Sequence, residues 1–324
     1  MAREIQIREQ SIRLGQLLKL AGVVGSGSEV KALLASVPLS VNGGPETRRG
    51  RQLHDGDVVR VQDEELVVSA AAGGSAVLHP LAAGFVDVAD SYERGRPEYT
   101  PAIVQAIAAE LHIAPGARVL DLAAGTGKLT RALLGVGLDV IAVEPQAELR
   151  EILLAGVGAQ RVLDGVAEKI PLSDASVAAV TVADAFHWFD HQAALREIQR
   201  VLVAGGGLAV LRILPDWSGA SWAHEVGTLI AELRPTHPQF EGPGWQEAAL
   251  AAGCWTSPRE IQLIMMQPAD PERVLDYIAS MSWMAALPED RRAATVARIG
   301  EIIGAGETPD ELPTHVIVGL TSLI

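Results

Sequence analysis

The sequence predicts an α/β protein: a doubly wound, mainly parallel, Rossmann-like sheet with a helical cap, preceded by a small α+β domain. Apolar strand segments alternate with amphipathic helical segments from about residue 82 onward, and a glycine-containing turn follows one of these strands. A short uncharged stretch divides the chain into two parts that differ in charge. With 324 residues, 48% of them hydrophobic, the chain can form two domains with buried cores.

Charge and composition locate the domain boundary. Residues 1–68 hold nine basic and nine acidic residues, so the whole formal net charge of −14 arises after residue 68. The stretch "SAAAGGSA" (69–76) that follows has the composition of a flexible linker. The sequence predicts a first domain over 1–68, a linker over 69–80 and a second domain over 81–324, whose cap covers roughly 215–256 and 268–306.

Composition also excludes several protein classes. The charged start of the chain lacks the apolar core of a signal peptide, and no run of about 18 apolar residues follows. A single cysteine, Cys254, allows neither an internal disulfide nor a zinc–thiolate site. We expect a cytoplasmic protein with no membrane segment and no bound metal.

The first domain is predicted to form two short helices and a β-hairpin. Apolar residues recur at helical spacing in "SIRLGQLLKLAG", where Ser11 is available as the N-cap, and again in "SGSEVKALLA". "LSVNGG" is a strand that runs into an Asn-Gly turn, and "DGDVVRV" is a glycine turn that runs into another strand.

These motifs, with "ETRRGRQL" between them, resemble the RNA-binding domain named after small-subunit ribosomal protein four, over roughly residues 3–62. The resemblance implies a basic face that binds structured RNA. Guanidinium groups suit phosphate oxygens, and such contacts position a protein on RNA without reading its sequence. The alternative is that the arginines only solvate a turn and pair with Glu46 and Asp55. The positions that match the basic face are Arg13, Lys19, Lys31, Arg48, Arg49 and Arg51.

The second domain begins its sheet with "ARVLDLAAGTGKLTRALL", an apolar strand, a turn and an amphipathic helix. Gly125 and Gly127 permit a tight turn and a close approach of the backbone to a ligand at the helix N-terminus. "DVIAVEP" adds a strand that ends in Glu144, 17 residues beyond Gly127, where a carboxylate can hold two ribose hydroxyls. "THVIVGLTSL" is predicted to be the last, antiparallel strand.

From about residue 82 to 324, the chain resembles class I S-adenosylmethionine-dependent methyltransferases. The resemblance is strongest over 117–212, where "DLAAGTGK", "VEP", "VAEKIPL", "FHWFD" and "RVLVAGGG" occur in the family's order. The relevant branch contains quinone-biosynthesis C-methyltransferases and trans-aconitate-type carboxyl methyltransferases. The resemblance implies a seven-stranded sheet and S-adenosylmethionine as the methyl donor.

The resemblance also implies a donor site. One carboxylate would orient the methionine end of the donor, the glycines would pass close to it, the acid after the second strand would hold the ribose, and the "AE" pair would lie beside the adenine. Each residue could instead be a cap, a turn residue or a solvated strand end, but their joint occurrence favours the donor site. The implied positions are Asp121, Gly125, Gly127, Glu144, Ala167 and Glu168.

Three positions depart from the family pattern. Ala123 stands where glycine is usual, Val166 where an acid often faces the adenine, and Ala204 where proline commonly precedes the paired glycines. We expect Ala123 to be tolerated and Val166 to remove one polar contact to the adenine.

Two segments supply candidates for the acceptor side. "SYERGRPEY" resembles the branch's N-terminal segment, so Tyr92, Arg94 and Arg96 are expected to close over donor and acceptor. "FHWFD" places His187 where it could act as a base or orient an acceptor oxygen, and Trp188 where it could wall the pocket. The alternatives are a packed tyrosine, surface arginines and a structural histidine.

Three functions fit the sequence. The first is a methyltransferase acting on a small molecule through a carboxylate, hydroxyl or activated carbon, with an RNA-binding domain attached. The second is an RNA methyltransferase, although the sequence has no Asn/Asp-Pro-Pro-aromatic motif for transfer to a base nitrogen. The third is a non-catalytic RNA-binding protein with a decayed enzyme fold, which the intact donor motifs oppose. The sequence names neither the acceptor, the RNA nor the oligomeric state.

Overall fold

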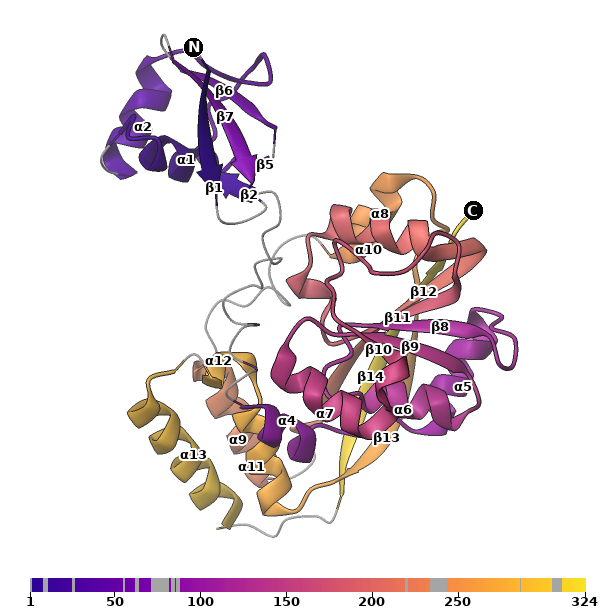
Figure 1. The fold of residues 1–324 in the computed structure, drawn as a ribbon. Coiled ribbons are helices and arrows are strands. Elements are labelled where there is room, and N and C mark those ends of the chain that lie inside the picture. Colours follow the sequence, from indigo (N-terminus) through magenta and orange to yellow (C-terminus); the bar gives the residue numbers. More distant parts are fainter. Residues whose placement is uncertain are drawn as a thin grey trace. The chain divides into compact units, whose positions relative to one another are not determined.

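The computed structural model describes residues 2–7, 11–24, 27–54, 56–61, 64–70, 82, 85, 88–218, 221–233, 244–285, 287–304 and 311–324. The chain forms two compact units, 1–78 and 79–324, which we describe separately (Figure 1). Most of the predicted linker over 69–80 lies outside the described residues, and the predicted domain limits stay predictions. None of the helices that the structure describes is both long enough and apolar enough to cross a membrane.

The first unit contains a five-stranded sheet in the order β1-β7-β6-β3-β4 and a separate pair of strands, β2 and β5. β1 runs parallel to β7, whereas β6 pairs antiparallel with both β7 and β3. Leu14, Leu17 and Leu18 of the first helix are fully buried in one core with sheet residues such as Val59. The elements are β1 (Ala2–Ile7), β2 (Ser11–Arg13), α1 (Leu14–Leu20), α2 (Gly27–Ser36), β3 (Leu39–Val41), β4 (Gly44–Pro45), β5 (Gln52–His54), β6 (Val58–Val61) and β7 (Glu64–Ala70).

The first helix begins later than its sequence predicted. Ser11 lies in β2 and pairs with His54 of β5, so it does not cap α1. Arg13 is the N-cap instead, because the strand pairing extends to that residue. The Asn-Gly turn is present: Asn42 and Gly43 have positive φ angles of 52° and 81° between β3 and β4.

The second unit is built on a seven-stranded sheet in the order β10-β9-β8-β11-β12-β14-β13, which confirms the predicted fold class. β10, β9, β8, β11 and β12 are parallel neighbours, and β14 runs antiparallel between β12 and β13. The strands are β8 (Arg118–Leu122), β9 (Asp139–Val143), β10 (Val162–Leu163), β11 (Val177–Ala183), β12 (Leu202–Pro215), β13 (Arg259–Pro268) and β14 (Glu311–Ser322). The helices include α4 (Ala89–Gly95), α5 (Pro101–Glu110), α6 (Lys128–Gly135), α7 (Ala147–Val157), α8 (His191–Val201), α9 (Ser221–Leu233), α10 (Trp245–Ala252), α11 (Pro271–Ala279), α12 (Ser282–Ala285) and α13 (Glu289–Gly304).

Helices cover both faces of this sheet, as a parallel sheet with two buried faces requires. On one face, α5 and α6 bury Ile103 and Leu133 against Val119 of β8. On the other face, α8 buries Ile198 in one core with Leu120 of β8. Because helices cover both faces, a ligand can bind at the edge of the sheet that is formed by the carboxyl ends of β8, β9 and β11.

The cap is smaller than predicted. α9, α11, α12 and α13 form a separate apolar core that includes Trp222, Ile278 and Ile303. The predicted cap over 215–256 also contained α10, but Trp245 and Ala249 of α10 pack in the sheet core with residues of α8. Because the apolar face of α10 is used on the sheet, we assign the cap to the other four helices.

Helix α4 touches the cap at Gly95. A β-carbon added at Gly95 would lie 2.1 Å from the backbone nitrogen of Tyr277 in α11 and 2.4 Å from the carbonyl carbon of Asp276. Both of these atoms belong to backbone and cannot rotate aside. The packing of α4 on the cap therefore requires glycine at this position.

Gly95→Ala is expected to destabilise the second unit by about 1–3 kcal/mol, because the methyl group forces α4 and α11 apart. The measurement is urea unfolding followed by tryptophan fluorescence. The matched control is Gly135→Ala at the end of α6, where an added β-carbon meets no atom within 4 Å. Equal unfolding midpoints for the two variants would contradict this packing constraint.

Candidate active site and basic loop

A glycine-containing loop joins β8 to α6. Ala123, Gly125 and Gly127 all have positive φ angles, of 56°, 57° and 89°. Gly127 is the N-cap of α6, and a β-carbon there would lie 2.4 Å from Cδ1 of Leu153. Gly127 is thus favoured by its positive φ angle, and an added β-carbon would also displace the Leu153 side chain. Ala123 adopts the left-handed backbone that the usual glycine would adopt with less strain.

Asp121, at the end of β8, is almost completely buried. Its Oδ2 accepts a hydrogen bond from Thr130 Oγ1 (2.6 Å), and its Oδ1 accepts one from Thr181 Oγ1 (3.3 Å). Burial raises the pKa of the Asp121 carboxyl to about 7, although these hydrogen bonds act in the opposite direction. The two threonines fix the orientation of this carboxylate beneath the loop.

Glu144, directly after β9, connects the second strand to the glycine loop. Its Oε2 accepts a hydrogen bond from the Gly125 N–H (2.8 Å), and its Oε1 accepts one from the Gln146 N–H (2.9 Å). Glu144 is only 3% exposed, and burial raises its pKa to about 7. Each carboxylate oxygen accepts one of these bonds and retains capacity for a further donor.

Ion pairs and a tyrosine ring hold the segment that contains α4 against this loop. Lys128 Nζ donates to Glu98 Oε1 (2.6 Å), and Arg131 Nη2 donates to Glu93 Oε1 (2.9 Å) and Glu98 Oε1 (3.1 Å). A β-carbon at Gly125 would lie 3.7 Å from the Tyr92 hydroxyl, so the tyrosine ring covers the loop. These four charged residues were not identified from the sequence, because their pairing joins segments about 30 residues apart.

Arg96 follows α4 and lies between two aromatic rings. Its guanidinium carbon is 5.2 Å from the ring centroid of Tyr92 and 4.9 Å from that of Tyr277. Its Nε also donates to Ser280 Oγ (2.9 Å). Burial raises the pKa of Tyr92 to about 12, so the phenol stays protonated at neutral pH.

Arg94 is placed differently from the prediction. Its guanidinium forms a bidentate ion pair with Asp276 of α11, at 2.7 and 2.9 Å, and its side chain is 61% exposed. It therefore ties α4 to the cap and does not line the cavities described here. This ion pair could not be predicted from the sequence, because Asp276 is 182 residues away from Arg94.

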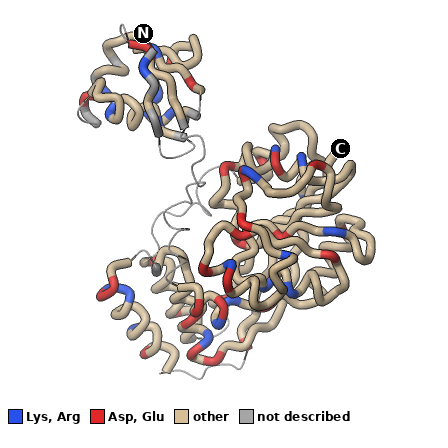
Figure 2. The backbone as a smooth tube through the Cα atoms, in the orientation of Figure 1, with Lys and Arg blue, Asp and Glu red and all other residues tan. Residues whose placement is uncertain are grey.

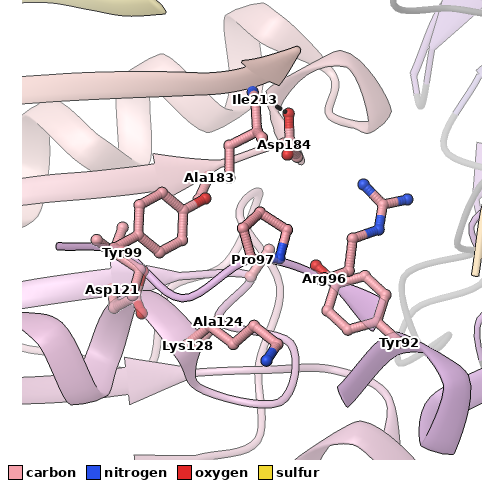
Figure 3. Close-up of a pocket in the computed structure, with 12 residues that line it drawn as sticks. Tyr92, Arg96, Pro97, Tyr99, Asp121, Ala124, Lys128, Ala183, Asp184 and Ile213 are labelled. Atoms are coloured by element: carbon pink, nitrogen blue, oxygen red, sulfur yellow. Dashed lines mark hydrogen bonds between the residues drawn. The ribbon is translucent and has the colours of Figure 1, made fainter. Parts of the chain in front are cut away.

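Two adjoining cavities lie at the carboxyl edge of the sheet. The donor-side hollow spans about 390 Å³, including space open to solvent, and is lined by Asp121, Ala124, Lys128 and Tyr92, among others (Figure 3). The larger chamber encloses about 1000 Å³, including space open to solvent. Its aromatic walls are Phe85, Trp188, Trp217, Tyr277 and Trp283.

Among the residues that the structure describes, three line both cavities: Arg96, Asp184 and Ile213. Asp184 directly follows β11 and has a positive φ of 48°. Its Oδ1 accepts a hydrogen bond from the Ile213 N–H (3.1 Å; Figure 3). The sequence interpretation missed Asp184, although an acid directly after a buried strand could have identified it.

Some of the remaining predicted residues line the chamber, and the others do not. His187 and Trp188 form one turn after β11, their ring centroids are 4.4 Å apart, and both line the chamber. Ala167 is buried, and Glu168 Oε1 accepts a hydrogen bond from the Asp190 N–H (2.8 Å). Burial raises the pKa of Glu168. Neither Ala167 nor Glu168 lines the two cavities.

The basic loop of the first unit is attached to the start of α1. Leu14 N–H donates to the carbonyl of Arg51 (2.8 Å), and Gly15 N–H donates to that of Arg49 (2.9 Å). The loop backbone therefore satisfies two of the free N–H groups at this helix end. Both arginine side chains are exposed, beside the exposed N-cap Arg13.

Glu46 pairs with two arginines of this loop, closely with Arg48 and more loosely with Arg51, whose Nε lies 4.0 Å from Glu46 Oε2. Arg48 donates from Nε and Nη2 to the two oxygens of Glu46, at 3.0 and 2.7 Å. These bonds hold the pKa of Glu46 down at about 2. Lys19, in the last turn of α1, and Lys31, in α2, are exposed. Basic and acidic residues both lie along this small unit (Figure 2).

Comparisons with known proteins match each unit. A family profile for a methyltransferase domain matches residues 120–210, and one for an S4 domain matches residues 5–69. An uncharacterized methyltransferase of Mycobacterium tuberculosis is 34% identical over 223 residues, which cover 69% of this chain and 86% of that protein.

Two further relatives match shorter parts of the chain. A ubiquinone/menaquinone biosynthesis C-methyltransferase of Burkholderia mallei is 36% identical over 128 residues, or 36% of this chain and 52% of that protein. A probable ribosome maturation protein of Bacillus subtilis is 47% identical over 62 residues, or 19% of this chain and 87% of that protein. The chain therefore belongs to the S-adenosylmethionine-dependent methyltransferases and carries an S4 domain ahead of its catalytic domain.

Proposed function

We propose that this enzyme methylates a small molecule held in the chamber, and that its S4 domain binds structured RNA. The observation that carries the first part is that the chamber and the donor-side hollow share described lining residues, namely Arg96, Asp184 and Ile213. A free volume of about 280 Å³ with aromatic walls suits a small ligand. Among the described residues of its lining, Arg96 is the one Arg or Lys, whereas a polynucleotide would be held along a track of several cations.

We assign the donor to the residues around the glycine loop. Asp121 orients its methionine end, Gly125 and Gly127 pass beside it, and Glu144 holds the ribose hydroxyls. The structure fits such a ligand, because the Gln146 Oε1 next to this carboxylate is buried without a hydrogen-bond partner. The bound donor supplies an electrophilic methyl group on a sulfonium. The segment with Ala167 and Glu168 is proposed to lie beside the adenine.

We assign the acceptor to residues that line the hollow or the chamber. Tyr92 and His187 contact the acceptor, Arg96 provides a positive charge, and Trp188 forms an aromatic wall. Their support is their common placement at these cavities. Arg94 is not included, because its guanidinium is engaged by Asp276.

RNA is the proposed partner of the S4 domain. The relative from Bacillus subtilis is named as a probable ribosome maturation protein, which supports an RNA-rich partner for this domain. Arg49 and Arg51 are the proposed phosphate contacts of the loop, together with Arg13, Lys19 and Lys31. Arg48 contributes less, because Glu46 already neutralises it. A cytoplasmic location remains a prediction from the sequence.

A second candidate function is methylation of RNA itself. The observation that favours it is the S4 domain in the same chain, which could deliver an RNA substrate. The two candidates differ in where the transferred methyl group is found.

Purified enzyme, donor labelled on its methyl group and a bacterial lysate separated into RNA and small molecules distinguish the two. We expect label in the small-molecule fraction only, because the chamber is compact and aromatic. Heat-inactivated enzyme is the control. Label in RNA that disappears when Arg49 and Arg51 are changed to Glu would instead establish the RNA methyltransferase.

Glu144→Ala is expected to weaken binding of S-adenosylhomocysteine by about tenfold to a hundredfold, since a hydrogen bond to a charged group is worth about 1.5–3 kcal/mol. Isothermal titration calorimetry measures the affinity. Glu151→Ala, on the exposed part of α7, removes the same charge and is expected to bind normally.

The same titration has an expected pH dependence. Burial raises the pKa of Glu144 to about 7, so the carboxylate becomes protonated as the pH falls through 7. In a protonated carboxyl, one oxygen carries a proton, so it accepts hydrogen bonds less well than the oxygens of the ionised carboxylate do. Affinity should therefore fall between about pH 8 and pH 6 in the native protein and in Glu151→Ala. A flat profile would contradict the role of Glu144.

Changing Arg49 and Arg51 to Glu is expected to weaken binding of ribosomal RNA and to lower the salt slope of binding by about 1 for each lost phosphate contact. Fluorescence anisotropy at several salt concentrations measures both. Arg60→Glu on β6, whose partner is Glu65, is the control for charge reversal in the same unit. Unchanged affinity of the double variant for ribosomal RNA would show that the loop is only a solvated turn.

A further inference from the structure

Asp184 and Arg96 bear opposite charges at the one place where the two cavities meet. Both line the donor-side hollow and the chamber, and Ile213 is the other residue that does so. A methyl group that passes from donor to acceptor must cross this junction. Side chains placed here can contact the acceptor atom that receives it.

Asp184 is fixed at this junction by the backbone. Its N–H donates to the carbonyl of Leu211 (2.9 Å), and its Oδ1 accepts from the Ile213 N–H (3.1 Å), so both bonds tie it to β12. The charged and titratable groups that influence it are Arg96, Arg212, Tyr92, Tyr99 and Tyr277. This carboxylate is used neither by the donor loop nor by the ion pairs that fasten α4.

Arg96 retains capacity for a further oxygen. Two tyrosine rings and Ser280 hold its guanidinium, but among the described residues no carboxylate lies within ion-pair distance of it. Arg96 and Asp184 nevertheless interact electrostatically. Among the described residues that line both cavities, these are the two charged side chains, and their charges are opposite.

The presence of one carboxylate and one guanidinium at the junction favours one kind of acceptor. An acceptor that arrives as an anion would leave the carboxylate opposite it unneutralised in a buried site. An uncharged acceptor that gives up a proton satisfies both groups, because the proton goes to the carboxylate and the new anion faces the guanidinium. The aromatic walls suit a planar body.

We propose that the acceptor is an uncharged, planar molecule with a weakly acidic hydroxyl, a phenol or an enol, and that Asp184 removes its proton while Arg96 stabilises the oxyanion. This inference rests on the proposed function, because it names the class of small molecule in the chamber. It extends that function by a catalytic residue and a substrate class.

The proposed step balances without another reagent. The acceptor O–H bond breaks, and its proton moves to an oxygen of Asp184. The acceptor oxygen forms a bond to the methyl carbon of S-adenosylmethionine, while the carbon–sulfur bond breaks and its electron pair stays on sulfur. The products are a methyl ether, S-adenosylhomocysteine and one proton, which leaves to solvent when the site opens.

Asp184 is better placed for this step than His187. His187 lines the chamber and a neighbouring outer cavity, but it does not line the donor-side hollow. Asp184 lines all three. The transferred proton must leave an oxygen that faces the donor, so the group shared with the donor side is the proposed base.

The first test determines the chemical form of the transferred methyl group. Small molecules from the lysate are labelled with methyl-labelled donor and purified enzyme, then treated with mild alkali and, separately, with hot hydriodic acid. An ether is expected to withstand alkali and to release labelled methyl iodide in acid. Labelled methanol released by alkali would reveal a carboxylate acceptor, and label that resists both treatments would reveal a carbon or nitrogen acceptor; either overturns the inference but keeps the proposed function. No label among small molecules overturns both.

The second test is Asp184→Asn. Asparagine tolerates the left-handed backbone and keeps an oxygen for the Ile213 N–H, so it removes the base with little structural change. Its kcat for the labelled small-molecule fraction is expected to fall by about a hundredfold or more with unchanged binding of S-adenosylhomocysteine. Asp174→Asn, at the exposed partner of Arg200, is the control.

The pH profile separates a base from a positioning residue. Activity of Asp184→Asn should keep rising toward about pH 10, where a phenol ionises without help, whereas the native enzyme should level off earlier. A variant that loses activity equally at every pH would assign Asp184 a structural role. The same rising profile in His187→Gln, and not in Asp184→Asn, would make the histidine the base. Either result overturns the inference.

Discussion

The structure of the active site depends on one buried carboxylate, that of Glu144. Its two oxygens hold the backbone of the glycine loop after β8 and the turn after β9, so two neighbouring strands end in one fixed surface. Burying a carboxylate is costly unless it is hydrogen-bonded, and both N–H donors are supplied by backbone that cannot turn away. The loop is therefore shaped before the donor binds, which lowers the entropy lost on binding.

The active site also requires a segment that covers this surface. The segment with α4 does so through two attachments: Glu93 and Glu98 bind Lys128 and Arg131 of α6, and Gly95 packs directly on the backbone of α11. The carboxyl edge of the sheet carries the proposed donor residues, and cap residues such as Trp283 form part of the wall of the chamber. It is α4 that joins them, and this places Arg96 where the hollow and the chamber meet.

Local patterns predicted the strands and turns that surround the candidate site. Asp121, the glycine loop and Glu144 belong to strand ends and turns, whose positions follow from hydrophobic periodicity and glycine spacing. Arg94 could not be placed in this way, because its partner Asp276 comes from a helix far along the chain. The same applies to α10, whose apolar stripe fits a cap as well as a sheet until the packing of Trp245 is known. Ser11 was misassigned because strand pairing with β5 outweighed a capping pattern.

The charge distribution gives the two units different relations to RNA. The loop of the S4 domain presents few unpaired cations, since Arg48 is already bound by Glu46. The excess of acidic residues lies after residue 68 and opposes phosphates near the catalytic unit. At physiological salt this repulsion is screened beyond about 8 Å. It does disfavour RNA in direct contact with the acidic unit. Binding through the first unit and chemistry on an uncharged small molecule in the second are therefore compatible within one chain.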